Sequence, residues 1–257
     1  MSSLAHASGQ AFASGSSIAR WDGEFPGSQD EAERIRDAAA TTIGPIRAWK
    51  LGGTMAAVRR EVGLSRQFFG MLAYPYVFED GAELSGFQTR LRGVESEYGF
   101  ELARDLTPND ADCDDVAFAA LFCGVRPAIE IPGARFAALG QCGGLGLVAD
   151  FGAAGGLVLG PLRPLPAPLA LDTAPVRLSI AGHQVAAGAG AAIDGGAMGP
   201  LRAFLRQALK AGYALRQGQT IVTGSCTGYV KAAPNQRVTA TFDALDASVS
   251  ATFVDGL

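Results

Sequence analysis

Three glutamates could together bind a divalent cation. Glu95 and Glu97 stand two residues apart in the run RGVESEYGFEL at 92–102, and Glu130 lies between two isoleucines in RPAIEI. Side chains alternate between the two faces of a strand, so Glu95 and Glu97 would point the same way. Carboxylates on one face repel, and a buried carboxylate is costly unless something pairs with it. Mg²⁺ prefers oxygen ligands and keeps positions open for water or substrate, so it would relieve both costs.

The same residues also have a purely structural explanation. Glu95 and Glu97 could form a solvated strand face, and Glu130 could be a core carboxylate paired with Arg126 or Arg135. Surface carboxylates are common, and buried ones are usually paired. Spacing alone leaves both explanations open, so the rest of the sequence has to decide between them.

Further short segments occur in an order that resembles a known family. Beside VESE and PAIEI, they are WKLGGT at 49–54, AD at 149–150, VLG at 158–160, GPL at 199–201 and the glycine-rich stretch ending in IVTGS at 221–225. Together they resemble the 2-keto-4-pentenoate hydratase branch of the fumarylacetoacetate hydrolase superfamily. The match runs from about residue 28 to Phe253, which is nearly the whole chain.

The resemblance implies a fold, a metal and a substrate class. It implies an α+β fold, with a mixed β-rich core (a roll or sandwich) and an N-terminal helical subdomain. It places Mg²⁺ or Mn²⁺ on Glu95, Glu97 and Glu130, where the metal would chelate a 2-keto or 2-hydroxydienoic acid and stabilise an enolate. Lys50 matches the family's active-site lysine, and a nearby cation would lower its pKa and suit it to proton transfer.

Five more residues are candidates with good structural alternatives. Thr54, Arg135, Thr223 and Ser225 could hold the substrate carboxylate through hydroxyl, guanidinium and backbone N–H groups. Thr54 could equally cap a helix, Thr223 could be a strand residue and Arg135 a structural ion-pair partner. Asp150 matches a catalytic acid of the family, although an aspartate beside glycines often forms a turn.

The sequence also departs from the family pattern at several polar positions. The family's Pro-Asp-Phe/Tyr-Gly is here QFFG, so an acid has become Phe68. Its Val-Asp-Ser-Arg is here PGAR, with Gly133 in place of an acid. Its Asp-Asn-Ala-Ser-Ser is here DFGAA, with Phe151, Ala153 and Ala154 replacing an amide and two serines. The pocket should therefore be less polar than usual, which suits an apolar substrate or chemistry that needs little help with water.

Three functions remain open. The first is a hydratase that adds water to a 2-hydroxy-2,4-dienoate, a step in the catabolism of aromatic or steroid ring-cleavage products. The second is a decarboxylase of a vinylogous 2-keto acid such as an oxalocrotonate, which needs the electron sink but no positioned water. The third is a non-catalytic homologue that binds 2-keto acids. C–C bond hydrolysis fits less well, because those enzymes use a His/Glu dyad, and the two histidines are His6 in a loose N-terminus and His183 at a hairpin tip.

Composition is consistent with one soluble enzyme domain over 1–257, with a helical subdomain at about 1–60 and the β-rich catalytic core at about 61–257. The net charge of −4 without a basic cluster argues against nucleic acid, and no apolar run approaches the roughly 20 residues that span a bilayer. No signal peptide begins the chain, and the four cysteines lack a CxxC pair, so we expect a cytoplasmic protein with reduced, mostly buried thiols. The resemblance also implies that the protein forms a homo-oligomer.

The elements that must position these residues can be predicted locally. A capping-box pattern predicts a helix from Ser28 to about Ile43, and others are expected at 54–63, 107–122 and 200–211. Strands are expected at the following ranges: 46–52, the two glutamate-bearing runs, 176–180, 184–187, 220–223, 237–242 and 248–253. The proline-rich stretch 161–175 predicts a long loop.

Overall fold

The computed structural model describes residues 2–84, 93–136 and 139–254, except for the side chains of 139–142. Within these ranges the strands are β1 (Ile46–Gly52), β2 (Phe68–Ala73), β3 (Val77–Glu79), β4 (Ala82–Leu84), β5 (Gly93–Leu102), β6 (Phe122–Pro132), β7 (Ala154–Leu159), β8 (Val176–Ile180), β9 (His183–Gly188), β10 (Thr220–Val222), β11 (Val230–Lys231), β12 (Arg237–Phe242) and β13 (Ala247–Phe253). They form two sheets. The larger has the order β2-β1-β10-β5-β6-β7-β3 with β11 beside β5, and the smaller has the order β4-β13-β12-β8-β9.

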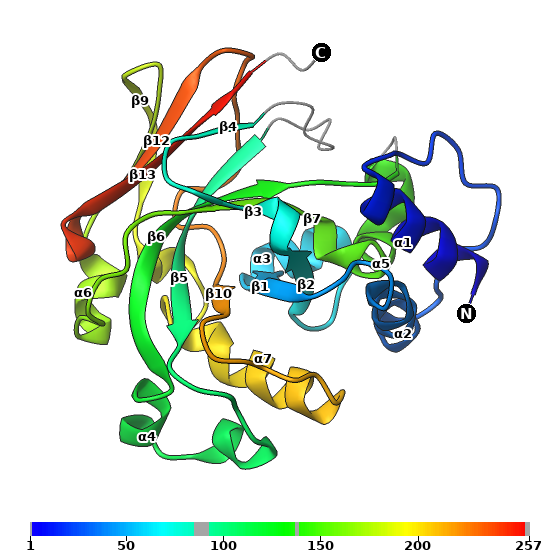
Figure 1. Ribbon diagram of the computed structural model, residues 1–257, viewed down its shortest axis with the longest axis horizontal. Coiled ribbons are helices and arrows are strands. Elements are labelled where there is room, and N and C mark those ends of the chain that lie inside the picture. The colour runs from blue at the N-terminus through cyan, green and yellow to red at the C-terminus, as the bar shows by residue number, and fades with distance from the viewer. Residues whose placement is uncertain (1, 85–92, 137–138, 255–257) are drawn as a thin grey trace.

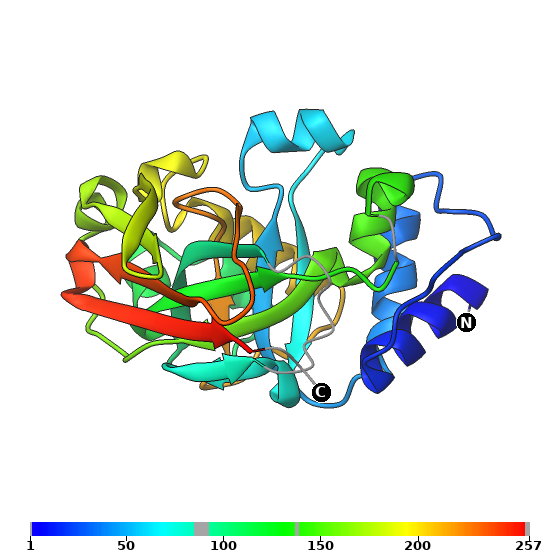
Figure 2. The same cartoon turned by 90° about the horizontal axis from the view of Figure 1, so that it is seen from above.

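Helices flank the two sheets. In the described ranges they are α1 (Ser3–Ser14), α2 (Gln29–Ala40), α3 (Ala56–Val62), α4 (Asp115–Ala119), α5 (Leu139–Ala149), α6 (Pro168–Thr173) and α7 (Gly199–Lys210). Helices α1, α2 and α5 pack together at one end of the molecule, and the smaller sheet occupies the other (Figures 1 and 2). This is the α+β fold with a mixed β-rich core that the resemblance implied.

The glutamate-bearing strands β5 and β6 lie in the middle of the larger sheet and pair antiparallel. As the alternation predicts, the apolar side chains of β5 share one face, and Tyr98 packs there against Phe242 of the smaller sheet, with ring centroids 5.0 Å apart. Glu95 and Glu97 therefore face the other way. Glu97 is fully buried and Glu95 is half-buried, so β5 does not present them on a solvated strand face.

Strand β1 brings Lys50 to the glutamates' side of the sheet. Its neighbour Trp49 points to the opposite side, where it packs against Phe69, Phe204 and Tyr213 at centroid distances of 5.8, 5.5 and 5.2 Å. The indole N–H donates to the side-chain oxygen of Gln219 at 2.9 Å. This aromatic cluster joins β1 and β2 to α7, so it fixes the strand that carries Lys50.

The N-terminus is a helix and not the loose segment expected from its composition. The Ser2 hydroxyl accepts a hydrogen bond from the backbone N–H of Ala5, and Gly15 ends α1 in the left-handed conformation. Leu4 and Phe12 are buried between these caps. Helix α1 has few large apolar residues, so its sequence gives only a weak indication of a helix. Packing against α2 stabilises it instead.

Two other helix predictions were wrong in detail. The helix expected at 107–122 is a 3₁₀ turn followed by the short α4, because Asp114 caps a new helix by accepting from the Ala117 N–H. Aspartates compete with the helix for backbone N–H groups, and several lie in this stretch. The loop expected at 161–175 contains α6, which begins at Pro168, where a missing N–H costs nothing.

Several local predictions are confirmed. Ser28 caps α2 by accepting from the Glu31 N–H at 3.2 Å, although this helix ends at Ala40. The hairpin β8–β9 turns through Ala181 and Gly182, both with positive φ. The helical subdomain expected to about residue 60 ends earlier, since β1 already belongs to the larger sheet; the single domain over 1–257 stays a prediction.

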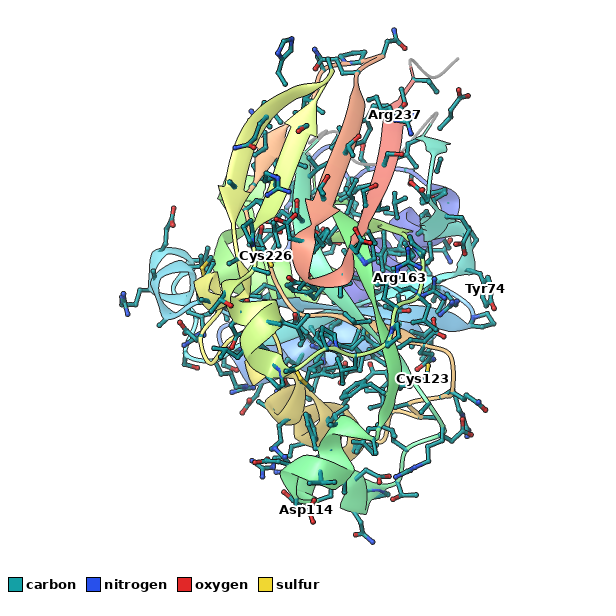
Figure 3. The ribbon with its side chains drawn as sticks, turned by 90° about the vertical axis from the view of Figure 1, so that its left-hand side faces the viewer. Tyr74, Asp114, Cys123, Arg163, Cys226 and Arg237 are labelled. Carbon is teal, nitrogen blue, oxygen red and sulfur yellow. The ribbon has the colours of Figure 1, made fainter. Side chains whose placement is uncertain are left out.

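Three of the four cysteines have described side chains, and these three are free, whereas the side chain of Cys142 lies outside the described residues. Cys226 is buried, Cys113 is half-buried and Cys123 is exposed, so the expectation of mostly buried thiols was wrong. Cys123 and Cys226 lie well apart (Figure 3). Among the described residues, no helix combines the length and the apolar character needed to cross a membrane.

Candidate active site

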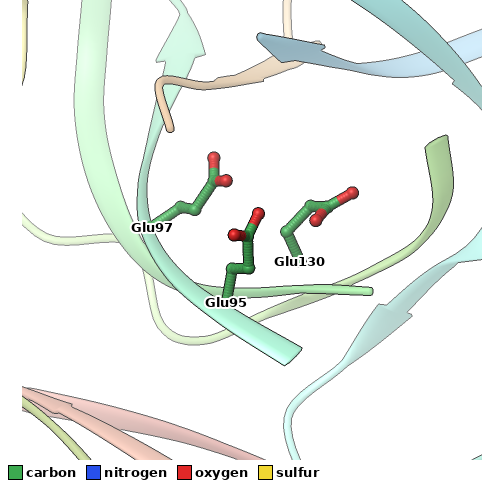
Figure 4. Close-up of side chains that lie close together, drawn as sticks. All are labelled: Glu95, Glu97 and Glu130. Atoms are coloured by element: carbon green, nitrogen blue, oxygen red, sulfur yellow. The ribbon is translucent and has the colours of Figure 1, made fainter. Parts of the chain in front are cut away.

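The three glutamates converge because of the register between β5 and β6. Glu130 is directly opposite Glu95 in the antiparallel pair, and Glu97 follows two residues along on the same face. One carboxylate oxygen from each lies within 4.8 Å of the others. Figure 4 shows the three side chains reaching into one space from the two strands. The three glutamates singled out in the sequence thus form a cluster in the fold, although Glu130 is distant from Glu95 and Glu97 along the chain.

The cluster has oxygen atoms without partners. Both carboxylate oxygens of Glu130 and Oε1 of Glu97 are buried and accept no hydrogen bond from a described residue. The remaining Glu97 oxygen accepts from the Gly224 N–H at 2.8 Å. Such acceptors are expensive to leave unpaired, and three hard oxygen donors this close fit Mg²⁺ or Mn²⁺. The residues present therefore fit the metal that the resemblance implied.

Without a cation the cluster holds protons tightly. Burial, and then repulsion from Glu95, raises the pKa of Glu97 to about 8. Burial also raises the pKa of Glu95, and that of Glu130 well above the ordinary value. Ligands must be deprotonated to coordinate a metal, so metal binding here should release protons.

Lys50 lies beside the cluster. Its ammonium Nζ is 3.7 Å from Oε1 of Glu130 and donates a hydrogen bond to the Gly152 carbonyl at 3.0 Å. Burial lowers the pKa of Lys50, but attraction to Glu130, Glu95 and Glu97 outweighs it, and the net direction is upward. The sequence analysis expects a lowered Lys50 pKa only when a cation is bound nearby. That lowered pKa therefore stays a prediction.

A cavity of about 180 Å³ opens beside these groups. Its polar lining consists of Lys50, Thr54, Glu95, Glu97 and Ser225 together with glycine backbone. The rest of the lining is apolar and comprises Leu51, Met55, Val58, Phe68, Pro132, Leu147 and Ala153. The loss of polar residues noted in the sequence thus falls partly on the cavity wall, at Phe68 and Ala153.

The turn after β10 provides hydroxyls close to the cluster. Thr223 and Ser225 are buried, and neither hydroxyl has a hydrogen-bond partner among the described residues. Gly224 between them has φ +108°, and a Cβ there would lie 2.1 Å from Oγ1 of Thr54. Glycine is therefore required, and its N–H is used by Glu97 and not kept for a substrate. Thr54 lines the cavity and does not cap α3, whose N-cap is Met55.

Asp150 and Arg135 lie behind the cavity wall and are not among its lining residues. The Asp150 carboxylate accepts from Arg135 Nε at 2.7 Å, from the Arg135 N–H at 2.8 Å and from the Ser8 hydroxyl at 3.0 Å. Both residues are almost fully buried. This geometry favours the structural ion pair over a catalytic Asp150 or a substrate-binding Arg135; those two roles stay sequence predictions.

Sequence reasoning missed two backbone contacts to site residues. The Gly152 carbonyl contacts Lys50, and the Gly224 N–H contacts Glu97. Backbone groups leave no residue-type signal, although both positions are glycines in glycine-rich segments. The two histidines are exposed on α1 and at the start of β9, in keeping with the view that neither is catalytic.

The raised carboxyl pKa values predict how stability depends on pH. The Glu97 carboxyl keeps its proton in the folded chain up to about pH 8 but loses it near the ordinary value of 4.5 when unfolded. Folding therefore takes up protons between these values, and the metal-free protein should lose on the order of a few kcal/mol of stability as pH rises from about 5 to about 8. Urea unfolding in EDTA measures this, and saturating Mg²⁺ should largely abolish the loss. A metal-free stability that rises over the same interval would contradict the assignment.

Comparison with known proteins identifies relatives. No protein-family model matches the chain. A 2-keto-4-pentenoate hydratase of Paraburkholderia xenovorans (strain LB400) is 31% identical over 185 residues, which cover 72% of this chain and 68% of the relative.

Solved structures share the fold. The 4-oxalocrotonate decarboxylase from Pseudomonas putida G7, complexed with magnesium and adipate, superposes with a TM-score of 0.85 at 23% identity, over 98% of this chain and 96% of that one. The fumarylpyruvate hydrolase from Pseudomonas aeruginosa, in complex with Mn²⁺ and pyruvate, gives a TM-score of 0.60 at 16% identity, over 93% and 94%. The sequence match to the hydratase confirms the family resemblance, and the solved structures share its fold: the chain belongs to the 2-keto-4-pentenoate hydratase family.

Proposed function

We propose that the protein is a divalent-metal-dependent hydratase that converts a 2-hydroxy-2,4-dienoate to a 4-hydroxy-2-oxo acid. The observation that carries the proposal is the buried cluster of Glu95, Glu97 and Glu130, with unpartnered oxygens, beside the Lys50 ammonium. The name of the hydratase relative supports the reaction, and the conditions of the two neighbouring structures, one with magnesium and one with Mn²⁺, support the metal.

Glu95, Glu97 and Glu130 would hold Mg²⁺ or Mn²⁺. When bound, such a cation polarises the carboxylate and 2-oxygen of the substrate and stabilises negative charge on the 2-oxygen. In the metal-free cluster the glutamates raise the pKa of Lys50. A bound cation would offset their charge and lower that pKa, so the Lys50 ammonium could then give up a proton to the substrate.

The protein's own groups account for the remaining steps. Lys50 would donate a proton to the terminal carbon of the dienol while the 2-hydroxyl group loses its proton, which leaves a 2-oxo-3-enoate. The released hydroxyl proton would restore the Lys50 ammonium. Water then adds at the β carbon of the unsaturated ketone, and its proton goes to the neighbouring carbon. Ser225 and Thr54 line the cavity and would hold the substrate carboxylate, whereas the buried Thr223 is not among the lining residues. The apolar wall, including Phe68, would accept the substrate tail.

The apolar wall also favours a second candidate. A decarboxylase of an oxalocrotonate-type acid needs an electron sink and no positioned water, and the described cavity lining has few polar groups beyond the glutamates, Lys50 and the two hydroxyls of Thr54 and Ser225. The shared fold of the decarboxylase structure fits both candidates equally. The reaction therefore has to be read from the product.

NMR in D₂O tests the proposal with 2-hydroxypenta-2,4-dienoate and with an oxalocrotonate. We expect the dienoate to give a 4-hydroxy-2-oxo acid with Mg²⁺ present, and no enzymatic product in EDTA. Loss of CO₂ from the diacid, with the dienoate unchanged, would replace the hydratase with the decarboxylase. Metal binding without turnover of either substrate would indicate the non-catalytic homologue and contradict both enzymatic candidates.

Two wider expectations accompany this proposal. We propose that the protein works as a cytoplasmic homo-oligomer, as the family resemblance implies. The free thiols of Cys113, Cys123 and Cys226 are consistent with a reducing compartment. Light scattering coupled to size-exclusion chromatography measures the oligomeric state directly, and a monomer at micromolar concentration would contradict the proposed homo-oligomer.

A further inference from the structure

A strained turn lies against the active site. Phe151, Gly152 and Ala153 have φ values of 54°, 61° and 58°, so the turn Phe151–Ala153 runs through three successive left-handed residues. Two of them carry a side chain, and residues other than glycine pay for this conformation. Such a turn persists only where its surroundings hold it, so it is a candidate for a functional constraint.

The turn contacts Lys50 directly. The Gly152 carbonyl accepts a hydrogen bond from Nζ at 3.0 Å, whereas the nearest Glu130 oxygen lies 3.7 Å away. The shorter contact therefore comes from the turn. A lysine has a long flexible stem, so a fixed carbonyl acceptor decides where its ammonium rests. Without that carbonyl the ammonium would be free to move onto the carboxylates.

Arg135 holds both ends of the turn. Its guanidinium donates to the Asp150 carbonyl, just before the turn, at 2.6 Å and to the Ala154 carbonyl, just after it, at 2.5 Å. The third guanidinium donor, Nε, is used by the Asp150 carboxylate at 2.7 Å. A planar fork with several donors in fixed directions can bracket a turn in this way, whereas a lysine ammonium cannot.

Helix α1 supports the same turn from the other side. The Ser8 hydroxyl donates to the Asp150 carboxylate at 3.0 Å. The ring of Phe12 lies 4.6 Å from that of Phe151 and 5.0 Å from the Arg135 guanidinium carbon, measured to ring centroids. The unusual backbone of Phe151 thus places its side chain against α1, and this packing offsets part of the strain.

We propose that Arg135, together with Ser8 and Phe12 of helix α1, positions the catalytic lysine by holding the turn Phe151–Ala153, whose Gly152 carbonyl fixes the Lys50 ammonium. Arg135 is then a positioning residue that acts on the rate without touching the substrate. The inference rests on the proposed function in one respect, namely that Lys50 donates a proton to the substrate.

The test is Arg135→Lys, which keeps the charge beside Asp150 but cannot bracket the turn. We expect kcat to fall by about 10- to 100-fold, with Mn²⁺ affinity unchanged. Combined with Lys50→Met, Arg135→Lys should cause little further loss, because both changes remove the same contribution. Wild-type kcat in Arg135→Lys, or losses that simply multiply in the double variant, would overturn the proposal.

A crystal structure of Arg135→Lys gives a readout independent of activity. We expect the Lys50–Gly152 hydrogen bond to be lost, and an unchanged bond would overturn the proposal. If the wild-type protein turns over no substrate, the proposed function fails while this structure still decides the positioning. Should Arg135→Lys not fold, Ser8→Ala replaces it in both measurements, with Ser14→Ala, an exposed serine on the same helix, as the matched control. Equal effects of the two serine variants would overturn the role of α1.

Discussion

Glu97→Gln should abolish metal-dependent turnover while the protein stays folded. The substitution removes the charge of a proposed ligand but keeps its size and the oxygen that can accept from the Gly224 N–H. Metal stabilisation of developing charge is worth several kcal/mol, so we expect kcat/KM to fall by about 1000-fold or more. Added Mg²⁺ should no longer raise the rate. The measurement is hydration rate against Mg²⁺ concentration for the variant and the wild type.

Glu101→Gln is the matched control. Glu101 lies on the same strand but pairs with Arg126 at 2.9 Å, outside the cavity. The Glu101→Gln variant should keep both the wild-type hydration rate and its dependence on Mg²⁺.

In EDTA near pH 8, Glu97→Gln should be at least as stable as wild type, because a repulsive charge is removed. Normal metal-dependent turnover by Glu97→Gln would show that the three glutamates are not the metal site.

Lys50→Met should separate proton transfer from metal binding. Methionine keeps much of the stem volume and removes the ammonium that lies 3.7 Å from Glu130. General acid–base catalysis contributes roughly 10²- to 10⁴-fold, and we expect a loss of kcat in that range. Mn²⁺ should still bind, and somewhat more tightly, since a nearby positive charge is gone. Single-turnover rates and a Mn²⁺ titration measure the two effects separately.

An exposed lysine provides the comparison for this variant. Lys210→Met at the end of α7 removes an exposed ammonium outside the cavity lining and should change neither quantity. If Lys50→Met retained the wild-type rate, the lysine would be a structural partner of Glu130. If it lost Mn²⁺ binding instead, Lys50 would serve to organise the carboxylates and not to move protons.

The site could be predicted from sequence where the chemistry is local. Alternation along one strand places Glu95 and Glu97 together, and this follows from the geometry of any strand. The pairing of Glu95 with Glu130 depends on the register between β5 and β6, which no local pattern determines. The family resemblance supplied that contact, and the fold confirms it.

Other parts of the structure could not be predicted in this way. Helix α1 is stabilised by packing, and its small residues make a weak periodic signal. The pairing of Asp150 with Arg135 and Ser8 links three distant segments through a buried ion pair. The Gly152 carbonyl contributes a backbone atom, which residue identity does not reveal. These long-range and backbone contacts are what place Lys50, so the arrangement of the site depends on tertiary structure.

Binding of Mn²⁺, followed by electron paramagnetic resonance, tests the central claim most directly. It measures the metal site without any assumption about the substrate. The account predicts that wild type and Glu101→Gln each bind one Mn²⁺ per chain, displaceable by Mg²⁺, and that Glu97→Gln and Glu130→Gln lose this binding. Equal Mn²⁺ binding by all four proteins, or none by the wild type, would contradict a metal centre formed by Glu95, Glu97 and Glu130.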